Sequence, residues 1–169
     1  MKKPIFLLSI ILIANITSLY YDWYIQWWWF DVLSHFAGGF FIAMLMAEYL
    51  ADRLIIKNQS TQNSLSARPS TNDISALVKN IIIVVGATVF IGVVWEFAEF
   101  IANQTLIEPV YRWFGVRGYF MGDLQDTVND LLMDITGAFA FLFSHFLWSR
   151  YPHKVKAGLE DNSNRLAQN

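Results

Sequence analysis

Residues 126–148 read DTVNDLLMDITGAFAFLFSHFLW, an apolar run that carries three acids in its first half. The run is long enough to cross the hydrocarbon core of a bilayer, which takes about 20 helical residues. Asp130 and Asp134 lie inside it, and a central Asp costs about 2.5–3.5 kcal/mol on the membrane-insertion scale. Because such a helix is marginal alone, the run predicts a bundle in which the acids turn inward or toward a water-filled cavity.

Three more apolar runs, at about 4–19, 31–50 and 80–102, extend this prediction to a bundle of four transmembrane helices. The composition agrees, because 55% of the residues are hydrophobic and only 15% are charged. A soluble domain carries about 25% charged residues. We therefore predict an all-α polytopic membrane protein with one transmembrane domain over 1–150. Gly39 and Gly137 continue the acidic faces of their helices and predict close contacts between helix backbones.

The first apolar run has a second interpretation. Lys2 and Lys3 precede it, as basic residues precede the apolar core of a cleaved signal peptide. No clear small-x-small cleavage site follows, so we favour a retained helix and keep the signal peptide as the alternative.

Two polar segments are expected outside the bilayer. Residues 57–79 are rich in Ser, Asn, Thr and Gln and have no hydrophobic period, which predicts a flexible cytoplasmic loop. The hydrophilic tail, 151–169, is expected to be cytoplasmic and loosely ordered.

The basic residues predict the orientation. Only Arg112 and Arg117 fall in segments on one side of the four spans. The other ten lie on the opposite side, and these are Lys2, Lys3, Arg53, Lys57, Arg68, Lys79, Arg150, Lys154, Lys156 and Arg165. Basic residues concentrate on the cytoplasmic side of membrane proteins, so both termini are expected to be cytoplasmic.

Two classes of site are excluded by composition. The chain has no cysteine, which excludes disulfides, thiolate metal sites and cysteine nucleophiles. Its net charge is -2 and it has no basic stripe, so we expect no nucleic-acid partner.

Acids and one histidine gather at the same end of three predicted helices. Asp31 and His35 are four residues apart at the beginning of the second helix and share a face. Glu96 and Glu99 lie near the end of the third helix. The beginning of the fourth helix carries four acids that fall within an arc of roughly 80° around the helix axis. These are Asp123, Asp126, Asp130 and Asp134. All of them fall toward the outer leaflet in an orientation that was derived from Lys and Arg alone.

Carboxylates and an imidazole suit a hard or borderline divalent cation. We predict that a divalent metal ion, of unspecified identity, is bound among Glu96, Glu99, Asp130 and Asp134. His35 or Asp126 would then act as acid or base. The remaining members of the polar site are Asp31, Asp123, Arg112 and Arg117. The two arginines are expected to contact a phosphate or to pair with the acids.

Each of these residues also has a structural interpretation that the sequence leaves open. These are an N-cap (Asp31), first-turn acids (Asp123, Asp126), an interior histidine (His35), acids facing interfacial water (Glu96, Glu99) and polar links between helices (Asp130, Asp134). The first-turn interpretation does not extend to Asp130 and Asp134, which lie too deep in the helix.

The three motifs FDVLSHFAGGF (30–40), WEFAEF (95–100) and GDLQDTVNDLLMDITGA (122–138) resemble a known family. They are similar to the small bacterial inner-membrane proteins of the YjdF type and, more loosely, to the VanZ-like proteins, named for a glycopeptide-resistance accessory protein. The resemblance implies a multi-pass protein of the bacterial inner membrane. It implies no particular reaction. VanZ-like proteins tend to have Gln where Glu99 stands, and residues 57–79 match neither group.

Three functions fit these observations. The first is a metal-dependent enzyme that acts on a lipid or lipid-linked phosphate substrate of the cell envelope. The second is a cation or proton transporter, and the third is a non-catalytic envelope or resistance accessory protein. Membrane lipids are expected partners of all three. The sequence does not specify the oligomeric state, and a homo-oligomer is compatible with it.

Overall fold

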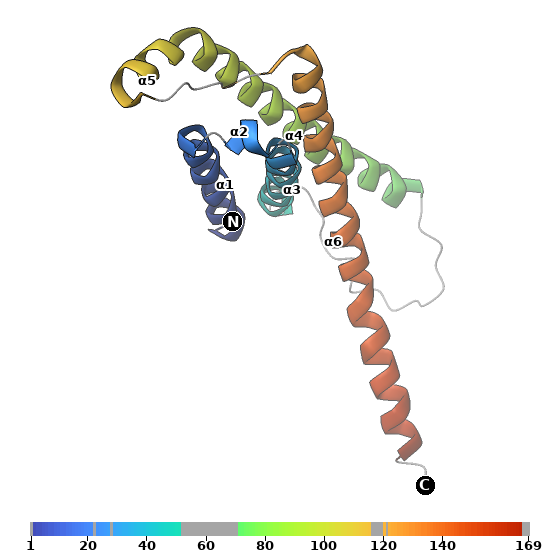
Figure 1. Ribbon diagram of the computed structural model, residues 1–169. Helices are drawn as coiled ribbons and strands as arrows, with labels where there is room; N and C mark the ends of the chain where they lie inside the picture. The colour runs from blue at the N-terminus through green and yellow to red at the C-terminus, as the bar shows by residue number, and fades with distance from the viewer. Residues whose placement is uncertain are drawn as a thin grey trace.

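A computed structural model describes residues 2–21, 23–27, 29–51, 71–115, 120 and 122–166, and all the regular secondary structure among them is helical (Figure 1). The elements in order are α1 (Lys2–Tyr21), α2 (Trp23–Gln26), α3 (Trp29–Ala51), α4 (Thr71–Thr105), α5 (Ile107–Phe114) and α6 (Leu124–Leu166). The all-α prediction is confirmed.

Three of these helices are long and apolar enough to cross a membrane, over Trp29–Leu50, Ile74–Thr105 and Leu124–Trp148. Their outer faces carry large apolar side chains that are mostly exposed, such as Phe90 at 69% and Phe143 at 64%. Lipid tails would cover such faces in a bilayer. The apolar run 4–19 lies within the helix α1. Its passage across the membrane, and the orientation of the bundle, stay predictions.

Helices α3 and α6 form the most extensive contact of the bundle, and glycine makes it possible. A Cβ atom on Gly39 would collide with the backbone of Asp134 in α6. A Cβ atom on Gly137 would collide with the carbonyl oxygen of Phe36 in α3. The two helices therefore meet backbone against backbone, as the small residues on these faces predict.

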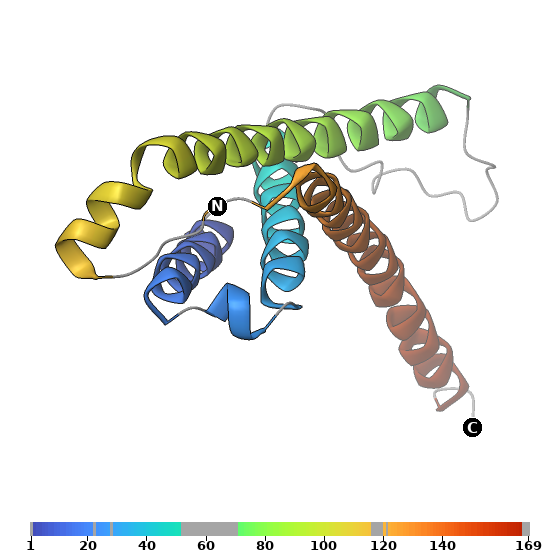
Figure 2. The ribbon, with the colours of Figure 1, turned by 45° about the horizontal axis from the view of Figure 1, so that its top comes forward.

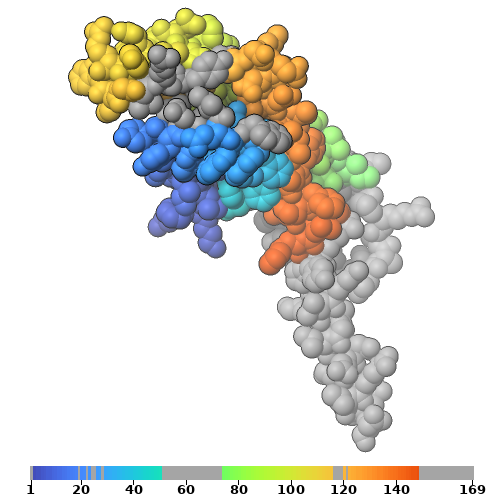
Figure 3. Space-filling model, viewed as in Figure 1, coloured from blue at the N-terminus to red at the C-terminus, as the bar shows by residue number. Residues whose placement is uncertain are grey.

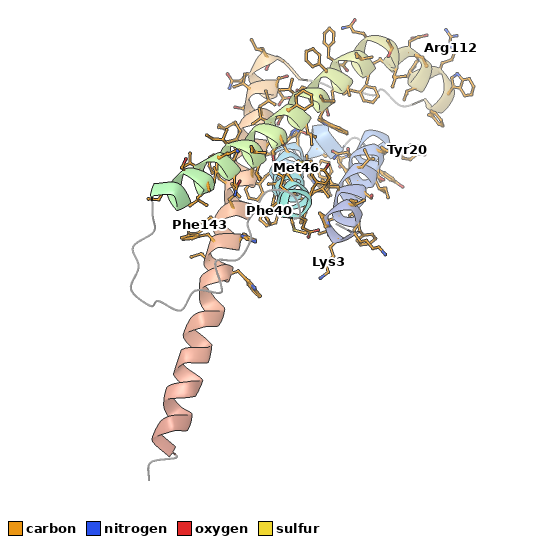
Figure 4. All side chains as sticks on the ribbon, turned by 180° about the vertical axis from the view of Figure 1, so that it is seen from behind. Lys3, Tyr20, Phe40, Met46, Arg112 and Phe143 are labelled. Carbon is orange, nitrogen blue, oxygen red and sulfur yellow. The ribbon has the colours of Figure 1, made fainter. Side chains whose placement is uncertain are left out.

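An apolar core fills the end of the bundle beyond these glycines. It consists of Ala43, Val84, Ala138 and Phe141, which come from α3, α4 and α6. The ring of Phe40 packs edge-on against that of Phe141, with 5.5 Å between centroids. Phe40 lies in the middle of the bundle in Figure 4.

The remaining helices are arranged around this pair. Helix α4 crosses both α3 and α6 (Figure 2). Helix α1 packs against α3 and, within the described part of the chain, contacts neither α4 nor α6. Helix α5 continues from the end of α4 to one edge of the molecule, where it is yellow in Figure 3.

Helices extend into both predicted polar segments. Residues 71–79 of the predicted loop form the beginning of α4, and its other residues lie outside the described part of the chain. Helix α6 continues through the predicted tail as far as Leu166, and the loose order of that tail stays a prediction. Polarity alone does not end a helix, because extension of a helix that has already formed is far easier than nucleation.

We predict that Gly39→Ala destabilises the bundle by about 1–3 kcal/mol, the usual cost of forcing extra atoms into a packed interface. Gly86→Ala is the matched control, because a Cβ atom there meets nothing within 4 Å and Ala favours a helix. Thermal unfolding in detergent, followed by circular dichroism, measures the difference. Equal stability of the two variants would contradict the close contact.

Candidate functional site

His35 lies at the centre of a buried ring of carboxylates, contributed by the three crossing helices α3, α4 and α6. Its side chain has a residual exposure of 6%. The Nε2 atom is 3.8 Å from Asp31 Oδ1, 3.9 Å from Glu96 Oε1 and 3.9 Å from Asp130 Oδ2. The Nδ1 atom lies 3.6 Å from Asp134 Oδ1. We call these five residues the His35 cluster.

The distances in the His35 cluster are longer than direct hydrogen bonds, which span about 2.7–3.2 Å for N–H and oxygen. They suit atoms that share a cation. Ligand bonds of about 2.0–2.6 Å place neighbouring ligand atoms on the order of 3–4 Å apart. Two overlapping groups of three residues fit this requirement, and within each group the potential ligand atoms lie within 4.8 Å of one another. One group is Asp31, His35 and Asp130, and the other is His35, Glu96 and Glu99.

The His35 cluster holds more acid than its own imidazole can neutralise. Among the described residues, His35 is the one side chain able to carry positive charge within 4.0 Å of these carboxylates. Glu96, Asp130 and Asp134 are each more than nine-tenths buried, where repulsion between like charges is poorly screened. A bound cation or bound protons must therefore balance the charge.

Two oxygen atoms of the cluster have no hydrogen-bond partner among the described residues, namely Glu96 Oε1 and Asp134 Oδ2. Buried polar atoms nearly always have a partner, and an exception calls for a water molecule, an ion or a functional role. Both side chains belong to the ring around His35. These unpartnered oxygen atoms are an observation separate from the number of carboxylates, and they point to a ligand within the cluster.

Asp134 occupies a gap that glycine leaves between the helices. A Cβ atom on Gly92 of α4 would collide with Asp134 Oδ2. A Cβ atom on Gly38 of α3 would lie 4.0 Å from Asp134 Oδ1. The carboxylate is thus enclosed by α3 and α4 in a position that a larger residue at 92 would fill.

Glu99 lies at the rim of the cluster. The indole Nε1 of Trp95 donates a hydrogen bond of 2.8 Å to Glu99 Oε1. Trp95 is one helical turn before Glu99 on α4, so the pair is held within a single rigid element. Glu99 keeps a polar group close to both His35 and Glu96.

Not all of the predicted site residues come together. The Oδ1 atom of Asp123 accepts backbone N–H groups of Gln125 at 2.9 Å and Asp126 at 3.1 Å, so Asp123 caps the beginning of α6. The carboxylate of Asp126 lies where a Cβ atom on Gly122 would be. Among the described residues, it makes no ion pair with His35 within 4.0 Å.

The predicted arginines have different outcomes. Arg112 Nη2 pairs with Glu108 Oε1 at 3.2 Å on the exposed surface of α5. It lies at the far end of that helix, away from the bundle (Figure 4). Among the described residues Arg112 makes no ion pair with the buried acids, and the expected contact with a phosphate stays a prediction. Arg117 lies outside the described residues.

The structure adds residues and a role that sequence reasoning missed. The sequence assigned His35 to acid–base chemistry, whereas both of its ring nitrogens face carboxylates. Two residues were not assigned to the site. Trp95 donates a hydrogen bond to Glu99, and Gly92 leaves room for the Asp134 carboxylate. The four-residue spacing of Gly92 and Glu96 was a usable signal, but Trp95 gave none.

Two cavities reach the His35 cluster from different sides. One, of about 290 Å³, ends at His35 and Asp134 and lies between α1, α3 and α4. The other, of about 320 Å³, lies between α4 and α6 and ends at Glu96 and Thr127. The Oγ1 atom of Thr127 is also buried without a hydrogen-bond partner in the described part of the chain. The cluster is thus accessible to small groups despite its burial.

Comparison with known proteins supports membrane placement. A family model described as a predicted membrane protein family, DUF2238, matches residues 4–151. The comparisons do not show a relation to the VanZ-like proteins. No curated protein and no solved structure matches the chain significantly. Because the family model covers most of the sequence, the chain belongs to the DUF2238 family of predicted membrane proteins, which is the family of the YjdF-like proteins.

Proposed function

We propose that this protein is a metal-dependent membrane enzyme that acts on a lipid or lipid-linked phosphate substrate. The observation that carries the proposal is the ring of carboxylates around one buried imidazole, with two unpartnered oxygens in it. A divalent cation among these groups would relieve the repulsion between them and give the unpartnered Oε1 atom of Glu96 a partner.

The geometry refines the predicted ligand set. Three carboxylates face the Nε2 atom of His35, which makes Asp31, Glu96 and Asp130 its best co-ligands. Asp134 faces the other ring nitrogen, Nδ1. Histidine ligands commonly donate this second N–H to a carboxylate that fixes the orientation of the ring. Asp134, which the sequence placed among the ligands, is therefore a positioning residue in this proposal.

The chemistry follows from a cation in an otherwise apolar site. It would polarise a phosphoryl or carbonyl oxygen and activate a water molecule for attack. Glu99, held by Trp95 at the rim, is better placed than Asp126 to accept or donate a proton. Transport is less well supported, because the apolar core of Ala43, Val84 and Phe141 follows the cluster along the bundle.

The substrate would approach from the outer leaflet of the bacterial inner membrane. The His35 cluster lies near the beginning of α3, the end of α4 and the beginning of α6, so it occupies one end of the three spans. With both termini cytoplasmic, as the distribution of basic residues predicts, this end faces outward.

The absence of cysteine from the chain allows a clean test of orientation with single substitutions. We expect Glu108→Cys to react with a membrane-impermeant maleimide in intact spheroplasts, because α5 would lie outside. Lys79→Cys should react only after the membrane is permeabilised. The reverse pattern would place the cluster on the cytoplasmic side and overturn the proposed access from outside.

Turnover of lipids tests the enzyme itself. In liposomes of total bacterial membrane lipid, we expect the purified protein to convert at least one lipid, as read by mass spectrometry, and EDTA to stop the reaction. Glu96→Gln should lose nearly all of this activity, whereas Glu108→Gln, the same change on exposed α5, should keep it.

Asp134→Asn separates positioning from ligation in the same assay. A weakened orienting contact typically lowers metal affinity by about 10–100-fold, so this variant should regain activity when more metal is added. Turnover that EDTA does not affect, or no turnover with any divalent cation, would argue against a metal-dependent enzyme and favour the accessory function.

A further inference from the structure

The cavity at His35 and Asp134 has mainly apolar walls, and Asn15 and Ser34 are its other polar lining residues. Its walls come from α1, α3 and α4, and they include Leu12, Ile42 and Ile91. The α3 wall extends from Ser34 to Leu45, which at 1.5 Å per residue is about 16 Å along the helix. Ser34 and His35 lie at the beginning of this length, Asp134 lies beside Gly38, and Ile42 and Leu45 follow at the apolar end.

The cavity lies between α1 and the rest of the bundle. Helix α1 packs on α3, and among the described residues its backbone stays apart from that of α4 (Figure 2). Its volume of about 290 Å³ lies near the lower limit for small-molecule sites, roughly 300–1,000 Å³. In a membrane, a space that opens between two helix sides is reached from the lipid phase rather than from water.

We infer that the cavity between α1, α3 and α4 binds one hydrocarbon chain of a lipid substrate and directs its polar head toward His35 and Asp134. The inference rests on the proposed function and names the substrate class for the same site. The aliphatic walls match a chain and offer it no hydrogen bonds. The cluster at the end offers donors, acceptors and space for a cation beside a head group.

This arrangement accounts for one feature that the metal site leaves unexplained. A metal centre alone needs no contact from α1, yet Leu8, Leu12 and Asn15 of that helix line the cavity.

Photo-crosslinking in lipid nanodiscs tests the inference. The probe is phosphatidic acid with a diazirine in its acyl chain, diluted into phosphatidylcholine, and labelled residues are identified by mass spectrometry. We expect labelling of Ile42 and Ile91 to be saturable and to fall at least fivefold with excess unlabelled competitor. Phe143, on the lipid-facing surface, should show labelling that competition does not change.

Two competitors distinguish the kinds of chain, unlabelled phosphatidic acid and a polyprenyl phosphate. Competition by either one supports the inference and identifies the chain as acyl or isoprenoid. Labelling of Ile42 that behaves like labelling of Phe143 with both competitors would overturn it. This comparison uses the wild-type protein and does not depend on how any variant folds.

Neighbouring substitutions on α1 provide the matched control. Leu12→Trp narrows the cavity and should reduce labelling of Ile42 at least fivefold. Ile13→Trp, at a position that is 63% exposed and does not line the cavity, should leave it unchanged. An equal effect of both variants would contradict a specific chain site.

Metal content of the same samples keeps the two proposals separate. Bound metal without saturable labelling would leave the metal site standing and remove the chain site. Saturable labelling without bound metal would leave the chain site standing and remove the metal site.

Discussion

The buried carboxylates around His35 repel one another, and the helices that carry them must pack together against this repulsion. The acids in and around the His35 cluster lie on helices α3, α4 and α6. Each acid raises the free energy of inserting its helix into a bilayer. Ion pairs and hydrogen bonds from the described residues do not satisfy them all, as Glu96 Oε1 and Asp134 Oδ2 show. A sequence that keeps this arrangement in an apolar setting needs a positive ligand or bound protons there.

The packing of the helices follows from the same requirement. Asp134 can reach His35 only because Gly39 lets α6 touch the α3 backbone and Gly92 leaves room on α4. Beyond that point Ala138, which is fully buried, and Phe141 close the bundle with an apolar core. Close helix contact and the polar cluster are thus two consequences of one set of small residues at helix crossings.

Much of this arrangement could be predicted from periodicity. The spacing of Asp31 and His35, and of Asp130 and Asp134, places each pair on one helix face, and the structure brings these faces together. What periodicity cannot give is the rotation of one helix relative to another. For that reason the sequence could not assign Nε2 of His35 to three carboxylates and Nδ1 to Asp134.

Other features lay beyond pattern reasoning for physical reasons. The ion pair of Arg112 with Glu108 is local to α5, four residues apart on one helix. The polar tail is hydrophilic, and extension of α6 into 151–166 needs no new nucleation. The cavity beside α1 depends on where that helix leaves the bundle, which no local signal encodes.

Electron paramagnetic resonance of the detergent-purified protein loaded with Mn²⁺ tests whether His35 and its carboxylates hold a cation. We expect one bound Mn²⁺ per chain, with modulation from a single imidazole nitrogen. That modulation should vanish in His35→Gln and persist in His145→Gln, because His145 is an exposed residue of α6. An absence of bound Mn²⁺ with no binding of other divalent cations, or nitrogen modulation that survives His35→Gln, would contradict it.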